Sequence, residues 1–181
     1  KDRRGIVWAD PFNREVHEYN IRIAEQAADL GFDEIQFDYI RFPSDGNVKE
    51  CRYTVTHTTT SADAALTAFL NSAYQRLKDK KVYVSACLFG LTTTVKHDMG
   101  IGQRIEKIGQ YVDFICPMVY PSHYAPGEFG FKEPELYPYE IVFKSLAAAK
   151  VKLQAKSVKL RPYLQDFSLK YRYGPDRVKA Q

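Results

Sequence analysis

Short apolar segments alternate with longer amphipathic segments along this chain, and this alternation constrains the fold more than any other feature. Extended segments are predicted at residues 5–10, 33–42, 81–90, 112–120 and 159–167, and helices at 14–30, 61–78, 101–110 and 139–155. Strands that alternate with helices are typical of parallel strands joined by crossover helices. The fold class is therefore α/β, and the choice lies between a (β/α)8 barrel and an open doubly wound sheet.

The polar content of the strands favours the barrel. No glycine-rich nucleotide-binding motif follows any predicted strand, which disfavours a doubly wound nucleotide-binding sheet. A barrel lumen, in contrast, can hold polar side chains near its carboxyl-terminal mouth. Four strong strands and one short extended segment are too few to close a barrel, which usually needs about 250 residues. We therefore expect residues 1–181 to form one partial TIM-barrel domain, covering roughly the third to the seventh strand.

Composition and charge exclude several functional classes. The chain is 45% hydrophobic and 27% charged, as is usual for a globular domain. No apolar run is long enough to span a bilayer, and no apolar signal-peptide segment follows Lys1. The net charge of +4 comes from dispersed basic residues late in the chain, so no nucleic-acid partner is predicted. The three cysteines, Cys51, Cys87 and Cys116, form no CxxC motif and no disulfide framework.

The segment GFDEIQFDYIRFP, Gly31 to Pro43, carries acids where a structural strand would carry Val or Ile. Because side chains alternate along a strand, Asp38 belongs to the polar face that points into the lumen. It is the last residue of that face, so it should lie at the mouth, where barrel active sites are built. Arg41 follows and could pair with a carboxylate or a substrate oxygen. The alternative is that Asp38 is a structural residue, buried and hydrogen-bonded or paired with an arginine.

Two other strand ends supply polar and aromatic side chains. Tyr120, His123 and Tyr124 follow one strand, and Gln165 and Asp166 end another. Aromatic faces combined with amide and carboxylate groups suit sugars, which offer C–H faces and hydroxyls together. Each of these residues is a weak signal alone, since Tyr120 could belong to the core and His123 to a loop.

Two other chemistries can be tested on the sequence. A Schiff-base aldolase needs a lysine at the mouth, but Lys81 and Lys159 lie at the beginnings of strands. A metal-dependent hydrolase needs several ligands together, and only His123 among the four histidines lies near a strand end. We therefore predict no metal and no cofactor.

Four segments resemble the DUF4015-type glycosyl hydrolase domain family of bacterial secreted or membrane-anchored proteins. They are DPFNREVHEYNIRIAEQAADLGFDEIQFDYIRFP, VYVSACLFGLT, IGQRIEKIGQYVDFICPMVYPSHY and LRPYLQDF, in family order. The resemblance implies a TIM-barrel, glycosidase-like domain with an extracellular or cell-envelope location. Membrane attachment would then come only through an anchor outside this chain.

Two positions depart from related patterns. GFDEIQFDYI is similar to the GFDGIDIDWE strand of chitinase-type barrels, and Asp38 matches the final Asp of that motif. The general-acid Glu of the motif falls on Ile40, which has no proton to donate. On the next strand, Cys87 stands where the family usually has an Asp. We interpret Cys87 as a buried small residue rather than a nucleophile, since no base is evident beside it.

The leading hypothesis is a glycoside hydrolase that acts on a bacterial cell-surface or extracellular polysaccharide. Asp38 is the predicted catalytic carboxylate, with Asp166 as a candidate for the second that such enzymes need. Ile40 and Cys87 motivate the alternative, a non-catalytic glycan-binding barrel, and a purely structural barrel is the third possibility. The predicted substrate-binding residues are Arg41, Tyr120, His123, Tyr124 and Gln165.

Overall fold

The structure is a computed structural model that describes residues 5, 7–154 and 157–181. Its helices are α1 (Arg14–Asp29), α2 (Thr59–Asp79), α3 (Ile105–Ile108), α4 (Pro138–Leu153) and α5 (Pro175–Ala180). Its strands are β1 (Glu34–Phe37), β2 (Tyr83–Phe89), β3 (Phe114–Met118) and β4 (Lys159–Leu160). Several 3₁₀ turns lie in the loops after the strands, among them Pro121–His123 and Pro134–Leu136.

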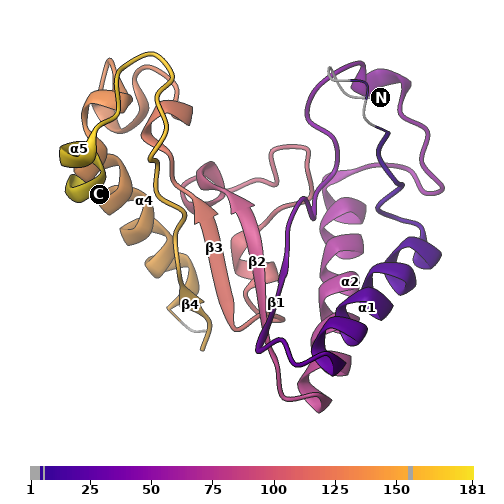
Figure 1. Cartoon of the computed structure of the whole chain (residues 1–181). Helices are drawn as coiled ribbons and strands as arrows, with labels where there is room; N and C mark the ends of the chain where they lie inside the picture. The colour runs from indigo at the N-terminus through magenta and orange to yellow at the C-terminus, as the bar shows by residue number, and fades with distance from the viewer. Residues whose placement is uncertain (1–4, 6, 155–156) are drawn as a thin grey trace.

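The strands form one parallel sheet in which the spatial order β1-β2-β3-β4 equals the order in the chain. Helix α2 joins β1 to β2, α3 joins β2 to β3, and α4 joins β3 to β4 (Figure 1). A doubly wound sheet reverses its strand order at a switch point, whereas a barrel winds in one direction. The described sheet has no reversal, so the predicted partial (β/α)8 fold is confirmed.

The two faces of the sheet differ in polarity. On one face Ile35, Phe37, Val84, Leu88 and Ile115 join a single apolar cluster with residues of the four helices α1 to α4. Burial of this face drives folding, as expected for the outer wall of a barrel. The opposite face carries polar side chains and corresponds to the lumen.

Local signals set the ends of the two long amino-terminal helices. The Asn13 side chain accepts a hydrogen bond from the Glu15 N–H at 2.8 Å and caps α1, and Gly31, with φ of +96°, follows its end. Helix α2 begins earlier than predicted, because Thr58 rather than Ser61 is its cap. The two side chains form a reciprocal capping box with each other's backbone N–H groups.

Two predicted elements are shorter in the structure. Strand β1 ends at Phe37 rather than at residue 42, because the Asp38 carboxylate accepts the Tyr39 N–H at 2.7 Å and Tyr39 adopts φ of +52°. The predicted helix 101–110 is only the single turn α3. The Asp98 carboxylate accepts the N–H groups of Gly100 and Gly102 and holds the preceding segment in a turn.

The last predicted strand is shorter in the structure, and the first is absent from the described sheet. Strand β4 contains two residues instead of nine, although Tyr163 beyond it still donates its N–H to the Pro117 carbonyl at 2.9 Å and forms an isolated bridge with Met118. Pro117 does lie inside β3. The described residues 7–10 belong to no strand, so the described sheet has four strands rather than five. Helix α5 was not predicted. Within the described residues, no helix is long and apolar enough to cross a membrane.

Candidate active site at the carboxyl ends of the strands

A network of polar side chains covers the lumen face of the sheet, and we call it the lumen floor. Arg161 donates from Nη1 to Oε2 of Glu34 at 2.9 Å, and the Ser85 hydroxyl donates to Oε1 of the same carboxylate at 2.6 Å. This pairing holds the pKa of Glu34 below its ordinary value. The members of the lumen floor are Glu34, Gln36, Ser85, Cys116, Arg161 and Tyr163.

The lumen floor shows that the sheet is curved. Strands β1 and β4 are separated by two strands, which in a flat sheet would place them about 14 Å apart. Nevertheless Arg161, next to β4, reaches Glu34 on β1, and the Tyr163 hydroxyl donates to Gln36. The polar face is therefore concave, as the inner wall of a barrel is.

Asp38 lies directly above the floor, one residue beyond the end of β1. Its side chain is exposed, and Oδ1 accepts the Tyr39 N–H at 2.7 Å. The charge of Asp38 acts on the neighbouring lumen groups: burial first, and then Asp38, raise the pKa of Cys87 to about 11. The predicted position of Asp38 at the carboxyl end of a strand is thus the one found.

Three aromatic rings form a cluster beside Asp38. Tyr120 lies edge-on to His123 with centroids 5.3 Å apart, and to Phe167 with centroids 5.2 Å apart. Desolvation lowers the pKa of His123, so its ring is neutral at pH 7, and Nδ1 is 3.0 Å from the Ser122 hydroxyl. The cluster joins the loop after β3 to the segment after β4.

Asp166 follows β4 in the chain and lines neither of the two cavities described below. Its side chain is exposed. Burial, followed by the electrostatic influence of Cys87, Asp38 and Asp166, raises the pKa of Tyr120. Among these influences on the pKa of Tyr120, that of Asp166 is the smallest.

Gln165 and Tyr124 are buried, unlike Asp38 and Asp166, although Tyr124 also lines the cavity that Tyr120 and His123 line. Gln165 has no exposed surface; it accepts the Ser122 N–H at 2.9 Å and donates to the Phe167 carbonyl at 2.9 Å. The Tyr124 side chain is buried, and its hydroxyl is 2.7 Å from that of Ser145 on α4. Both side chains thus hold together the loops that carry the ring cluster.

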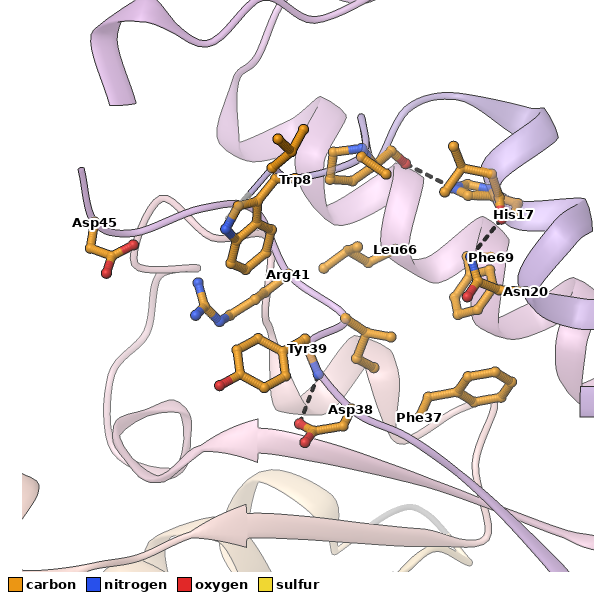
Figure 2. Close-up of a pocket in the computed structure, with 15 residues that line it drawn as sticks. Trp8, His17, Asn20, Phe37, Asp38, Tyr39, Arg41, Asp45, Leu66 and Phe69 are labelled. Atoms are coloured by element: carbon orange, nitrogen blue, oxygen red, sulfur yellow. Dashed lines mark hydrogen bonds between the residues drawn. The ribbon is translucent and has the colours of Figure 1, made fainter. Parts of the chain in front are cut away.

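Arg41 is surrounded by aromatic rings. Its guanidinium lies 4.5 Å from the Trp8 ring centroid, 4.9 Å from that of Phe89 and 5.3 Å from that of Tyr39. It also donates to the Phe42 carbonyl and the Ser44 hydroxyl. Figure 2 shows the Arg41 side chain between the Trp8 and Tyr39 rings, with Asp38 below Tyr39.

Two cavities meet at the segment 38–41. A cavity of about 450 Å³ is lined by Cys87, Phe89, Tyr120 and His123 among others. A cavity of about 700 Å³, drawn in Figure 2, is lined by Trp8, Asp45, Leu66, Phe69 and several further residues. Both volumes fall in the range of ligand-binding clefts. Asp38, Tyr39 and Arg41 line both cavities, so the candidate carboxylate faces both.

The two departures found in the sequence have structural counterparts. Cys87 is 4% exposed, and its raised pKa keeps the thiol protonated, in agreement with a buried small residue rather than a nucleophile. Ile40 is half-buried and packs against the apolar cluster of the outer wall. Among the described residues, no group of three or more His, Cys, Asp or Glu side chains is arranged to hold a metal ion.

Several residues of the ring cluster, the lumen floor and the cavities were not predicted. Phe167 follows Asp166 directly, and its place at a strand end was a usable signal. Tyr163 lies on the same alternating face as Gln165, which alternation along the strand would have shown. Phe89 is the last residue of β2, so its strand end was also a usable signal. Trp8 reaches the site through folding of the chain around Arg41, and no sequence spacing indicated that.

The winding of the chain and the polar lumen define a partial (β/α)8 barrel, with an exposed carboxylate at the carboxyl end of β1. A family model described as "Putative glycosyl hydrolase domain" (DUF4015) matches residues 1–181. The chain therefore belongs to this family of glycosyl hydrolase domains, as the resemblance in the sequence indicated. A comparison with curated proteins found no match.

Solved structures support the fold. The spore cortex-lytic enzyme SleL of Bacillus megaterium is 19% identical with a TM-score of 0.53, over 83% of this chain and 30% of that one. The PgaB glycoside hydrolase domain of Bordetella bronchiseptica is 13% identical with a TM-score of 0.52, over 92% of this chain and 63% of that one. The chain thus spans less than two thirds of these relatives, and the likeness shows a common fold.

Proposed function

We propose that this domain hydrolyses glycosidic bonds of a bacterial cell-surface or extracellular polysaccharide, with Asp38 as a catalytic carboxylate. The observation that carries the proposal is the place of Asp38. It is an exposed acid at the carboxyl end of a barrel strand, facing two cavities lined by aromatic rings. Family membership supports the reaction class.

The reaction consumes one water molecule for each bond broken. The bond between the anomeric carbon and the bridging oxygen breaks, and its electron pair stays on that oxygen, which takes a proton from an acid. The water oxygen bonds to the anomeric carbon and gives up a proton to a base, directly or after a covalent intermediate. Asp38 supplies one of the two carboxyl groups in this proposal, and Asp166 is the candidate for the other.

The remaining predicted residues divide into two roles. Tyr120 and His123 offer ring faces and polar atoms to a sugar, and Arg41 offers guanidinium N–H groups at the junction of the cavities. Gln165 and Tyr124 position these groups by holding their loops, since both side chains are buried. No cofactor is proposed.

The relatives inform the substrate and the location only by analogy. The solved relatives include a spore cortex-lytic enzyme and a glycoside hydrolase domain. We extend this to a glycan outside the cytoplasm as the substrate and to an extracellular or cell-envelope location. No nucleic-acid partner is proposed, and any membrane attachment would lie outside this chain.

A second function is a glycan-binding domain without turnover. It is favoured by Ile40, which stands where the chitinase motif has its acid, and by Cys87, which stands where the family has an Asp. Ile40 has no ionisable proton, and burial raises the pKa of Cys87 to about 11, so its thiol is a poor acid at neutral pH.

The test compares wild-type protein with Asp38→Asn and with the control Asp79→Asn, because Asp79 is exposed at the end of α2 and lines neither cavity. Release of reducing ends from bacterial polysaccharides is measured alongside binding. Release by the wild type and the control, lost in Asp38→Asn with binding intact, is the expected result. Binding without release by any of the three proteins overturns hydrolysis in favour of the binding domain.

A further inference from the structure

The larger cavity carries aromatic groups that the proposed chemistry does not use. The Tyr39 side chain is 67% exposed, although Tyr is largely apolar. Its backbone has φ of +52°, a conformation that is costly for a bulky residue. An exposed ring held by a strained backbone next to a candidate catalytic acid indicates a functional constraint.

The Trp8 ring accompanies Tyr39 at the entrance of this cavity. The two rings lie edge-on with centroids 6.1 Å apart. The Arg41 guanidinium lies within 5.3 Å of both centroids and fixes the pair, a cation–π arrangement. Figure 2 shows both rings and Arg41 along one side of the cavity. The two rings are therefore held in a fixed arrangement by Arg41 and are not independent surface residues.

The position of this pair relative to Asp38 matters most. Trp8 lines only the larger cavity, whereas Tyr120 and His123 line only the smaller one. Asp38 and Tyr39 line both. Aromatic groups are thus present in both cavities that meet at the candidate carboxylate. A ligand long enough to contact both sets would pass over Asp38.

We propose that Trp8 and Tyr39 form a second sugar-binding subsite, and that the substrate is a glycan chain bound across Asp38 and cleaved at an internal bond. This inference rests on the proposed function for the cleavage, but the subsite is testable by binding alone. Aromatic faces stack on the C–H faces of sugar rings, and the adjoining charged groups contact hydroxyls. A substrate recognised only by its terminal unit would need one of the two cavities.

The probes are β-1,4-linked N-acetylglucosamine oligomers from disaccharide to hexasaccharide, and the corresponding glucose oligomers. Binding is measured by calorimetry on wild type, Trp8→Ala, Tyr39→Gly and Trp8→Phe. Tyr39→Gly removes the ring at a backbone conformation that glycine adopts freely, so it should fold. Tyr19→Ala is the control, because Tyr19 is 60% exposed on α1 and lines neither cavity.

The expected result is wild-type affinity that rises with oligomer length in one of the two series. Trp8→Ala and Tyr39→Gly should lose about tenfold for the hexasaccharide while keeping disaccharide affinity, and Trp8→Phe and Tyr19→Ala should stay near wild type. The subsite is overturned if the wild type binds no oligomer or if its affinity does not rise with oligomer length. It is also overturned if Trp8→Ala and Tyr39→Gly keep the wild-type affinity for the hexasaccharide.

Turnover then separates this inference from the proposed function. Affinity that rises with length but forms no product upholds the subsite and rejects hydrolysis of that glycan. Where product does form, internal cleavage predicts mixed oligosaccharides early in the reaction, and a raised KM for the hexasaccharide in Trp8→Ala with unchanged disaccharide kinetics. Early release of monosaccharide alone overturns internal cleavage.

Discussion

Arg161 and Glu34 form an ion pair across the lumen, with Nη1 of Arg161 2.9 Å from Oε2 of Glu34. The two residues belong to opposite ends of the sheet, and only its curvature brings them together. The pair closes the floor beneath Asp38 and connects the strand that carries this acid to the segment that leads to Asp166. The geometry of the site therefore depends on a contact between two residues that are far apart in the chain.

Glu34→Gln should remove a pH-dependent part of the stability. Arg161 holds the pKa of Glu34 below its ordinary value of 4.5, so the stabilisation is complete above that value and is lost as the pH falls through the folded pKa. We expect the variant to be less stable by about 1–2 kcal/mol at about pH 6, a figure reduced for solvent screening, and the difference to shrink as the pH falls below 4.5. Urea unfolding of both proteins at a series of pH values measures the difference in unfolding free energy. A difference that is the same at every pH would contradict the prediction.

Gln165→Leu should destabilise the protein and loosen the ring cluster. The change leaves the Ser122 N–H and the Phe167 carbonyl without the partners they have now. The expected loss is about 2–4 kcal/mol of unfolding free energy. Gln26→Leu, at an exposed position on α1, is the matched control and should stay within about 0.5 kcal/mol. Equal urea midpoints for the two variants would show that Gln165 has no bracing role.

Tyr39→Gly should be more stable than Tyr39→Ala by about 1 kcal/mol, because only alanine retains the cost of the positive φ. Both variants lose the same exposed ring, so the comparison isolates the backbone. Thermal unfolding of the pair measures the difference. A more stable alanine variant would mean that the backbone at this position is not strained.

One thiol should react much faster than the other two. Cys87 and Cys116 are 4% and 1% exposed, and burial raises the pKa of both, whereas Cys51 is partly exposed. An aromatic disulfide reagent at about pH 8 should titrate a single fast group, and Cys51→Ser should abolish that phase. Fast modification of Cys87 in the folded protein would reopen its assignment as an inert residue.

Much of the fold follows from local patterns. Helices α1, α2 and α4 and strands β2 and β3 lie within a few residues of their predicted positions, because periodicity and capping signals are local. The missed boundaries depend on side chains that bind the backbone, as Asp38 does at Tyr39 and Asp98 at Gly102. Hydrogen bonds between a side chain and the backbone cannot be inferred from the spacing of apolar residues.

The site was predictable where it depends on alternation along a strand. The lumen orientation of Asp38 and its place at the mouth required only the period of two. The role of Gln165 was not predictable, because it depends on a loop that folds over the side chain and donates the Ser122 N–H to its amide oxygen. The place of Trp8 in the site was not predictable either, since the chain must fold around Arg41 to bring the ring to the cavity.

The central claim is that Asp38 takes part in the chemistry and not only in binding. The most direct test measures, on one polysaccharide that the wild type cleaves, both turnover and affinity of Asp38→Asn. The account predicts a fall in kcat of about 10³-fold or more with affinity changed by less than about threefold. Retained turnover in Asp38→Asn, or parallel loss of affinity and rate, would contradict it.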